Sequence, residues 1–121
     1  VGLKARGLKL AVVSNREHPS LPLERTGLAK YFDVIVGAHE PFGHLPYKPN
    51  SAMIDATVQH FGLDTEQAVY VGDADIDILT ALNSGVKAIG ITKGNFSDYD
   101  FMRLGAWKSI HELSQLLELF N

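Results

Sequence analysis

The segment VYVGDADIDILTALNSG, residues 69–85, decides how the chain folds, because it joins an apolar strand pattern to a helical pattern. Three aspartates lie within five residues at this junction. Like charges this close repel, so the crowding predicts a cation or a cationic partner. A calcium loop with D-x-D-x-D spacing needs glycine at its sixth position and glutamate at its twelfth, where this chain has Ile78 and Ser84. We therefore expect a cation other than calcium.

The composition is that of one ordinary globular domain and excludes several classes of protein. The chain has 121 residues, of which 45% are hydrophobic and 21% charged. A net charge of −3 gives no sign of a basic surface, so we expect no nucleic-acid partner. The absence of cysteine excludes disulfides and thiol chemistry and is typical of a cytoplasmic protein. No apolar run approaches the roughly 20 residues of a membrane span, so we expect no membrane partner.

Apolar runs alternate with helical patterns along the chain. The runs predict strands at residues 8–14, 32–36, 68–71 and 86–91. The chain opens with the tail of a predicted helix over residues 1–6, which stops at Gly7. Further helices are predicted at residues 21–29, at residues 50–61 with Asn50 as the cap, before Gly85, and at residues 99–104. A final amphipathic helix is marked by Ile110, Leu113, Leu116, Leu117 and Phe120. This alternation indicates an α/β fold, with a parallel sheet covered by helices on both faces.

Polar side chains follow the predicted strands at the points where ligands bind in such folds. They are Ser14 and Asn15 after the first strand, Lys48 before the second crossover helix, and Asp73 and Asp77 after the third strand. Ligands bind outside the carboxyl ends of parallel strands, so we expect these groups on one rim. A hydroxyl and a lysine suit phosphate oxygens, and carboxylates hold Mg²⁺. Phosphoryl transfer needs little more, which predicts a small phosphorylated metabolite as substrate.

Three segments in this order resemble sequence motifs of one enzyme superfamily. They are KARGLKLAVVSN (residues 4–15), YKPNSAMIDATVQHFGL (residues 47–63) and VYVGDADIDILTALNSGVKAIGIT (residues 69–92). Together they make the chain similar to the haloacid dehalogenase (HAD) superfamily, in its phosphoglycolate-phosphatase-like branch. The resemblance implies a Rossmann-like, three-layer core with a parallel sheet.

The resemblance also implies a role for each residue of the rim. Ser14, followed by Asn15, matches the phosphate-binding hydroxyl of the second motif, and Lys48 matches the lysine of the third. In the fourth motif, G-D-x-x-x-D, Asp73 matches the magnesium ligand and Asp77 the second acid. The remaining aspartate of this stretch, Asp75, falls between the motif positions, and we expect it to be exposed or to cap the following helix.

The first motif of the family, D-x-D-x-[TV], has no match before Ser14. It carries the nucleophilic aspartate, and its strand lies between the strand ending at Ser14 and the one ending at Val71. We therefore expect a partial core domain over residues 1–121 that lacks its central first strand, with a missing amino-terminal segment or a second chain completing the sheet. Direct pairing of the two flanking strands would refute this expectation. The interval from Ser14 to Lys48 is too short for a cap domain, so none is expected in the chain.

The predicted activity of the intact enzyme is hydrolysis of a phosphate monoester with Mg²⁺ through a phosphoaspartyl intermediate, and the chain alone is expected to be inactive. The alternatives are a catalytically inactive binding or regulatory module of the same fold, and a phosphomutase of the same superfamily. A dehalogenase is disfavoured, because dehalogenases need no magnesium and the carboxylates are present.

Four further residues have chemistry that the motifs do not use. A metal pair of His39 and His44 is disfavoured by its spacing within a Pro/Gly loop, and contact with substrate or a cap is the better prediction. Arg16 follows the phosphate-binding residues but is expected to be solvated. Trp107 is expected to pack beneath the final helix.

Overall fold

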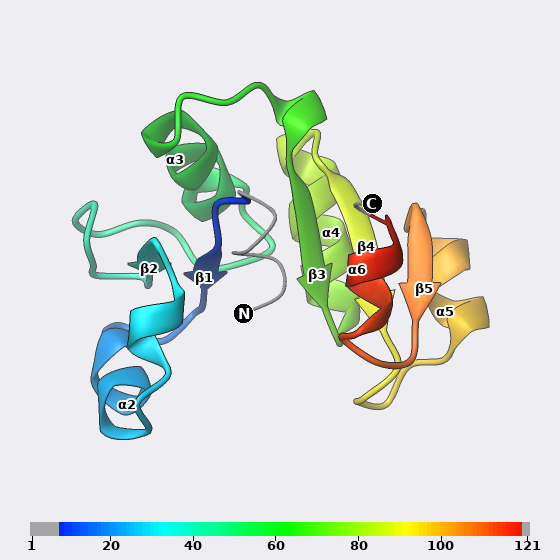
Figure 1. The fold of residues 1–121 in the computed structure, drawn as a ribbon. Helices are drawn as coiled ribbons and strands as arrows, with labels where there is room; N and C mark the ends of the chain where they lie inside the picture. Colours follow the sequence, from blue (N-terminus) through cyan, green and yellow to red (C-terminus); the bar gives the residue numbers. More distant parts are fainter. Residues whose placement is uncertain (1–7, 120–121) are drawn as a thin grey trace. The chain divides into compact units, whose positions relative to one another are not determined.

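Two separate parallel sheets organise the chain, one in each of two units that divide between Gly62 and Leu63 (Figure 1). The computed structural model describes residues 8–119. The first sheet has the strand order β1-β2 and the second has the order β3-β4-β5. The predicted helix tail over residues 1–6, with its stop at Gly7, lies outside the described residues. None of the helices in the described part is long and apolar enough to span a bilayer.

The first unit places one helix against a two-stranded sheet. Its elements are β1 (Ala11–Val13), α2 (Ser20–Arg25), the 3₁₀ helix η1 (Ala29–Tyr31), β2 (Val34–Val36) and α3 (Ala52–His60). The two strands pair in parallel, and α3 packs against both. The buried side chains of α3 include Met53 and Ile54. The predicted cap, Asn50, lies one residue before the observed N-cap, Ser51, and its Oδ1 accepts the N–H of Ala52 at 2.8 Å.

The second unit is a three-stranded sheet with helices on both faces. Its elements are the 3₁₀ helix η2 (Thr65–Gln67), β3 (Val69–Gly72), α4 (Asp75–Ser84), β4 (Lys87–Ile91), α5 (Asp98–Leu104), β5 (Lys108–Ile110) and α6 (Gln115–Leu119). Figure 1 shows α4 and α5 on one face of the sheet and α6 on the other. The central strand β4 is buried over Ala88, Ile89, Gly90 and Ile91. The layered parallel arrangement predicted from the sequence is therefore present in this unit.

Glycine sets two features of the second unit. Gly85 ends α4 in a left-handed conformation with φ +81°, as the sequence predicted. Gly90 in β4 lies against Phe101 of α5, since a Cβ added there would come within 2.3 Å of the ring. Phe101 is completely buried, so this close approach fixes α5 on the sheet.

The final predicted helix is partly wrong. Ile110 is the buried last residue of strand β5, where it pairs with Ile91 of β4, and only residues 115–119 form a helix. Leu113, predicted for the apolar face, is 61% exposed in the turn between them. The spacing of apolar residues imitated a helix because a strand end and a short helix follow one another closely. Phe120 lies outside the described residues.

The helix predicted at residues 21–29 is also shorter than expected. It ends at Arg25, and Gly27 then adopts φ +75° while the N–H of Leu28 bonds to the carbonyl of Leu23 at 2.9 Å. This closing turn leads into η1 instead of continuing the helix.

The strands β1 and β3 are less buried than the strand with two neighbours. All residues of β1 and β3 are half-buried although their side chains are almost all apolar, whereas four of the five residues of β4 are buried. Among the described residues β1 pairs with β2 within the first unit, and β3 pairs with β4 within the second. A missing central strand, and completion of the sheet by another segment, stay predictions.

Candidate active site

The fourth-motif turn of the second unit is shaped by contact between Gly72 and Asp77. A Cβ added to Gly72 would lie 2.2 Å from Asp77 Cβ and 2.4 Å from its Oδ2, so only glycine lets the end of β3 approach the first turn of α4 this closely. Asp77 is only 6% exposed. Its Oδ2 accepts the N–H of Ala74 at 3.2 Å, and the Tyr70 hydroxyl lies 3.5 Å from its Oδ1. The carboxylate is therefore held in place by the start of its own helix.

Asp73 is the exposed carboxylate of the same turn. It follows the last residue of β3, at the carboxyl edge of the parallel sheet. The loop after β4 passes close to it, because a Cβ added to Gly94 would lie 3.0 Å from the carbonyl oxygen of Asp73 and 3.6 Å from its side-chain Cγ. Asp75 is also exposed, as expected, but it is the first residue of α4 and not its cap, which is Ala74; its Oδ1 accepts the N–H of the next residue, Ile76, at 2.8 Å.

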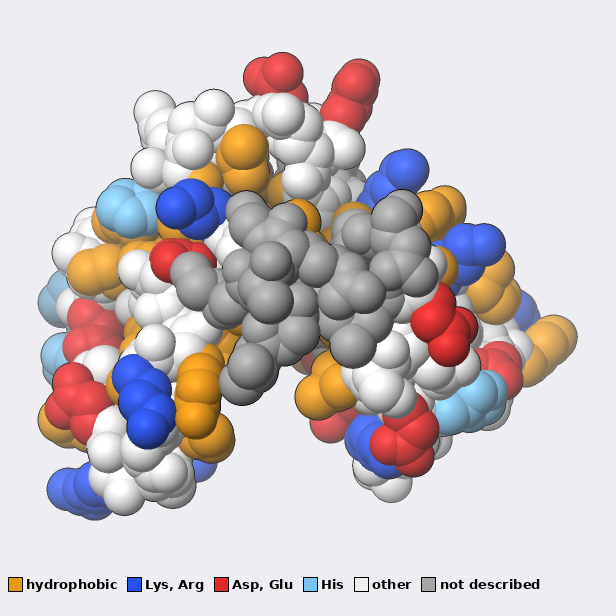
Figure 2. Space-filling model, in the orientation of Figure 1, with side chains coloured by type: hydrophobic (Ala, Val, Ile, Leu, Met, Phe, Trp, Pro, Cys, Tyr) orange, Lys and Arg blue, Asp and Glu red, His pale blue; other side chains and the backbone are white. Residues whose placement is uncertain are grey.

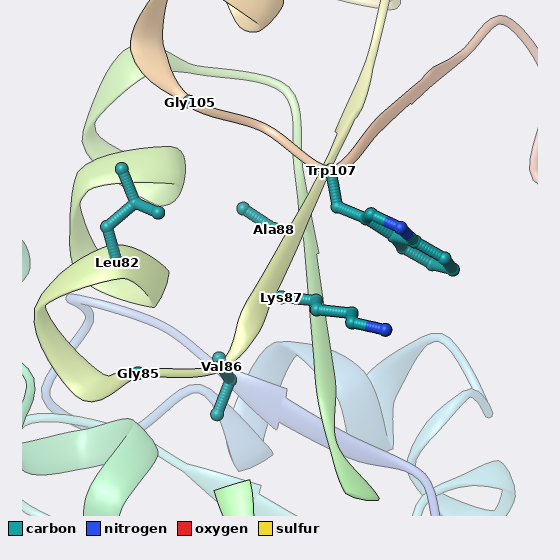
Figure 3. A pocket seen from close by; sticks show the side chains of 7 residues that line it. All are labelled: Leu82, Gly85, Val86, Lys87, Ala88, Gly105 and Trp107. Carbon is teal, nitrogen blue, oxygen red and sulfur yellow. The ribbon is translucent and has the colours of Figure 1, made fainter. Parts of the chain in front are cut away.

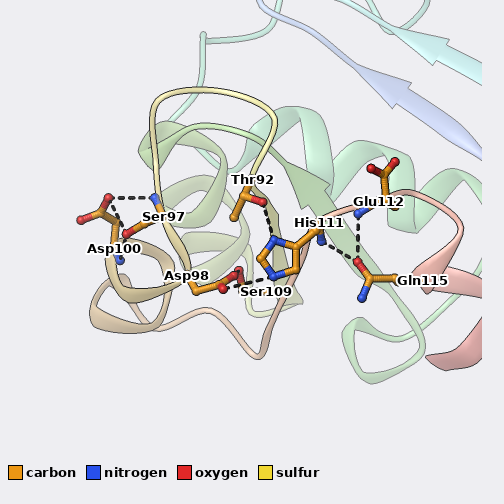
Figure 4. A network of polar contacts seen from close by, with 8 residues as sticks. All are labelled: Thr92, Ser97, Asp98, Asp100, Ser109, His111, Glu112 and Gln115. Carbon is orange, nitrogen blue, oxygen red and sulfur yellow. Dashed lines mark hydrogen bonds and ion pairs between the residues drawn. The ribbon is translucent and has the colours of Figure 1, made fainter.

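A polar network that sequence analysis missed fixes the loop beside Asp73 (Figure 4). Thr92 Oγ1 lies 2.9 Å from His111 Nδ1, and His111 Nε2 lies 3.2 Å from Asp98 Oδ2. Ser109 donates a hydrogen bond to the other oxygen of Asp98. His111 thus joins the two ends of the loop that contains Gly94. No short motif announces this network, because its members come from the ends of two strands and a helix.

The second-motif residues of the first unit lie in a tied loop after β1. The N–H of Ser14 continues the sheet by bonding to the carbonyl of Val36 at 2.9 Å. Ser14 Oγ accepts the N–H of Arg16 at 3.1 Å, which leaves its hydroxyl hydrogen to donate elsewhere. Asn15 Oδ1 accepts the backbone N–H of Lys48 at 2.7 Å. One amide side chain therefore links the predicted phosphate-binding hydroxyl to the predicted phosphate-binding lysine across 33 residues.

A cavity of about 320 Å³ opens over β1 beside Ser14. Its lining is mostly apolar, with Ser14, Arg16 and Thr26 as the polar members; the other residues are Val12, Pro19, Pro22, Leu23 and Leu28. Arg16 is exposed, as predicted, and it also lines the cavity, where its side chain can reach a bound molecule. A hydroxyl and a guanidinium at one opening can both donate hydrogen bonds to an anion.

The loop after β2, residues 37–49, carries the histidines that sequence analysis considered as metal ligands. The rings of His39 and His44 stack with centroids 4.0 Å apart and planes 7° apart, and His18 meets His39 edge-on at 6.0 Å. Stacked rings do not aim their nitrogens at one point, so this pair is not a chelating arrangement. Figure 2 shows histidine side chains, in pale blue, at the surface of the first unit.

A second cavity, of about 250 Å³, lies at the amino edge of the second sheet (Figure 3). Its lining includes Val86 and Lys87 at the start of β4, so it is at the opposite end of the strands from Asp73. Trp107 also lines it and is 37% exposed, with Lys87 Nζ 4.4 Å and Lys108 Nζ 5.5 Å from the ring centroid. These are cation–π contacts, and they describe the ring better than the predicted packing beneath the final helix.

The carboxylates present suit a magnesium ion held with few protein ligands. Among the described residues no group of three or more His, Cys, Asp or Glu side chains has a metal-binding arrangement. Mg²⁺ commonly uses one or two carboxylates together with waters and substrate phosphate oxygens, so two aspartates on one turn are compatible with it. Asp73 is exposed and available as a direct ligand, while Asp77 is engaged by Ala74 and Tyr70.

Comparison with known proteins agrees with the motifs. The model of the family described as haloacid dehalogenase-like hydrolase matches residues 2–91. The chain belongs to the haloacid dehalogenase-like hydrolases. The phosphoglycolate phosphatase of Aquifex aeolicus is 40% identical to it over 87 residues, which are 70% of this chain and 39% of that protein. The Escherichia coli phosphoglycolate phosphatase is 33% identical over 94 residues, 76% of this chain and 36% of that protein.

The fold is also that of solved HAD structures. A HAD phosphatase from Thermococcus onnurineus superposes with a TM-score of 0.85 at 27% identity, over 99% of this chain and 54% of that one. The chain spans less than half the length of the curated relatives named above. The Rossmann-like α/β class predicted from the sequence is therefore confirmed.

Proposed function

We propose that the full-length protein is a Mg²⁺-dependent phosphate-monoester hydrolase, to which this chain contributes the phosphate-binding and metal-binding edges. The observation that carries the proposal is the turn at Gly72, which buries and fixes Asp77 while leaving Asp73 exposed at the carboxyl edge of β3. Membership of the HAD hydrolases and the similarity to phosphoglycolate phosphatases support it. The substrate class we propose is a small phosphorylated metabolite, with 2-phosphoglycolate as the first compound to test.

The first unit supplies the groups that bind the phosphate. Ser14 keeps its hydroxyl hydrogen for a phosphate oxygen because its Oγ already accepts the N–H of Arg16. Lys48 brings a positive charge, and its backbone is fixed by Asn15. The amide nitrogen of the same Asn15 carboxamide is suited to donate to a phosphate oxygen. These three residues orient the phosphate and neutralise its charge.

The second unit supplies the groups that hold the metal. Asp73 would be the direct ligand, and Asp77 would support the metal or the lysine from its fixed position. Bound Mg²⁺ supplies electrostatic stabilisation of the phosphoryl oxygens as charge develops on them. We propose that Ser14, Lys48, Asp73 and Asp77 act on one phosphate.

The nucleophile is proposed to be an aspartate from a segment outside this chain, in a strand that completes the sheet between β1 and β3. The half-burial of these two apolar strands supports this, because each has one hydrogen-bonded neighbour in the described part while the buried strand β4 has two. The chain alone is accordingly expected to lack activity. We propose a cytoplasmic location, in keeping with the absence of cysteine.

The test is hydrolysis of 4-nitrophenyl phosphate and of 2-phosphoglycolate by the full-length protein, with and without Mg²⁺. Asp73→Asn is expected to lower kcat/KM by about a hundredfold or more, since it removes charge at the metal. Asp75→Asn is the matched control: it makes the same change at another exposed aspartate of the same stretch, and is expected to stay within about twofold.

Four results would contradict the proposal. Activity independent of Mg²⁺ or an unchanged Asp73→Asn variant would remove the metal role of this turn. A wild-type protein that binds phosphate but turns over no monoester would favour a binding module. Phosphate transfer between positions of a sugar, without release of inorganic phosphate, would favour a phosphomutase.

A further inference from the structure

The carboxylate of Glu40, in the loop after β2, is a partly buried charge that the proposed chemistry does not use. Its side chain is 22% exposed. Oε1 accepts the N–H of Ser20, the first residue of α2, at 2.8 Å, and Oε2 lies 3.2 Å from His18 Nδ1. The backbone carbonyl of Glu40 also accepts the N–H of Gly37 at 2.7 Å. Three hydrogen-bonding groups therefore converge on one residue of a surface loop.

These contacts join the two loops that carry the phosphate-binding residues. His18 and Ser20 follow Ser14 after β1, whereas Glu40 belongs to the loop that leads to Lys48. Two backbone bonds run in parallel with the carboxylate: Ala38 N–H to Arg16 at 2.8 Å and His39 N–H to Glu17 at 3.1 Å. Asn15 makes the last link, to the N–H of Lys48. The two loops are thus tied together at several points along their length.

Glu40 contributes a carboxylate to the contacts that join the two loops, and its hydrogen-bond partners favour the charged form of that carboxylate. Burial raises the pKa of Glu40, but hydrogen bonds from Ser20 and His18 outweigh it and leave the pKa below the ordinary value of 4.5. A fixed anion with both oxygens engaged holds its partners more firmly than a neutral acceptor does.

Other roles for Glu40 fit the structure less well. A metal ligand would need neighbouring donors that converge, and the stacked His39 and His44 rings do not provide them. Both carboxylate oxygens already accept from groups of the loop after β1, so a substrate donor would have to share them with these partners. A helix cap alone would explain the bond from Ser20 but not the contact with His18.

We propose that Glu40 is a positioning residue for phosphate binding, because it holds the loop of Ser14 and the loop of Lys48 at a fixed separation. The inference rests on the proposed function, since a phosphate must be bound for the spacing to matter. Glu40 touches neither the phosphate nor the metal in this role. It acts through the backbone of the two loops.

The experiment compares Glu40→Ala, Glu40→Gln and Glu17→Gln in the full-length protein. Glu40→Ala is expected to raise KM and the inhibition constant of inorganic phosphate about tenfold while changing kcat less, since a displaced binding group costs affinity first. Glu40→Gln keeps an oxygen that accepts from Ser20 and is expected to recover most of the loss. Glu17→Gln is the matched control, because Glu17 also reaches across to His39 but at 3.6 Å and 59% exposed, and it is expected to have no effect.

Amide hydrogen exchange supplies a readout that does not depend on activity. Exchange at Ala38, His39 and Lys48 is expected to be faster in Glu40→Ala than in wild type, and unchanged in Glu17→Gln. Unchanged exchange would overturn the inference, and so would faster exchange with an unchanged phosphate inhibition constant. An inactive wild type that also fails to bind phosphate overturns the proposed function and this inference together, whereas an active wild type with an unaffected Glu40→Ala variant overturns only the inference.

Discussion

The two units hold their polar edges by different physical means. In the second unit, a glycine lets a strand end press against a helix, so that Asp77 is fixed by close packing and by the backbone of its own helix. In the first unit, Ser14 and Lys48 lie on two loops joined by hydrogen bonds that the side chains of Asn15 and Glu40 accept. Packing tolerates almost no added volume, whereas a set of hydrogen bonds can lose one member and relax. The same kind of substitution should therefore have different consequences in the two units.

The largest effect is expected from Gly72→Ala in the second unit. The new Cβ would lie 2.2 Å from Asp77 Cβ, and neither the strand end nor the helix start can move without breaking the turn. We expect the free energy of unfolding to fall by about 3 kcal/mol or more, measured by urea denaturation. Gly27→Ala is the control: its φ of +75° is strained for alanine but nothing lies within 4 Å of an added Cβ, so a loss of about 1 kcal/mol is expected. Equal losses would show that the Gly72 contact is not tight.

A smaller effect is expected from Asn15→Leu in the first unit. The change leaves the N–H of Lys48 without its acceptor, which should cost about 1–3 kcal/mol in the free energy of unfolding and weaken phosphate binding. Asn15→Asp keeps an acceptor oxygen at the same place and is the matched variant for stability. A stability of Asn15→Leu equal to that of wild type would mean that the loops are held without this bond, and the contrast between the units would be lost.

The smallest effect is expected from acid titration of Glu40. Its pKa is below 4.5 in the folded protein, so its contribution is present above that pH and is lost as the pH falls through the folded pKa. The difference in unfolding free energy between wild type and Glu40→Gln should therefore shrink as the pH falls below 4.5. Hydrogen bonds from Ser97 lower the pKa of Asp100 as well, so the wild-type curve alone does not isolate Glu40. An increase of this difference in unfolding free energy as the pH falls would contradict the stabilising role of the charged carboxylate.

Much of the fold was accessible from the sequence because its signals are local. The glycine at position 85 marks the end of α4, and continuous apolar runs mark β3 and β4. The strand β5 was missed because only Ile110 of its three residues is buried, and its pairing with β4 depends on residues far away in the sequence. Short strands of this kind carry too little pattern to be distinguished from the start of a helix.

Part of the candidate site could likewise be predicted from the sequence, and part could not. Asp73, Asp77, Ser14 and Lys48 could be chosen from the sequence because each follows a recognisable strand or motif. The links that hold them could not, because Asn15 reaches Lys48 across 33 residues and Glu40 reaches back to Ser20 across 20. The reason for glycine at position 72 also appears only when the side chain of Asp77 is seen beside it.

The tie between Asn15 and Lys48 has a consequence for how this region can change. The loop after β2 is bound at both ends to one short stretch of the chain. At one end the N–H of Ala38 bonds to the carbonyl of Arg16, and at the other the N–H of Lys48 bonds to the side chain of Asn15. Within the loop, the N–H of Leu45 bonds to the carbonyl of Ala38 at 2.7 Å, and this bond separates residues 39–44 from the two ends of the loop. A residue beyond the bond between Leu45 and Ala38, such as Phe42, can thus be exchanged while both ends of the loop stay in place. Gly43 is an exception, because its φ of +86° favours glycine. Sequence changes there can therefore alter the surface of the first unit without disturbing the link between Asn15 and Lys48.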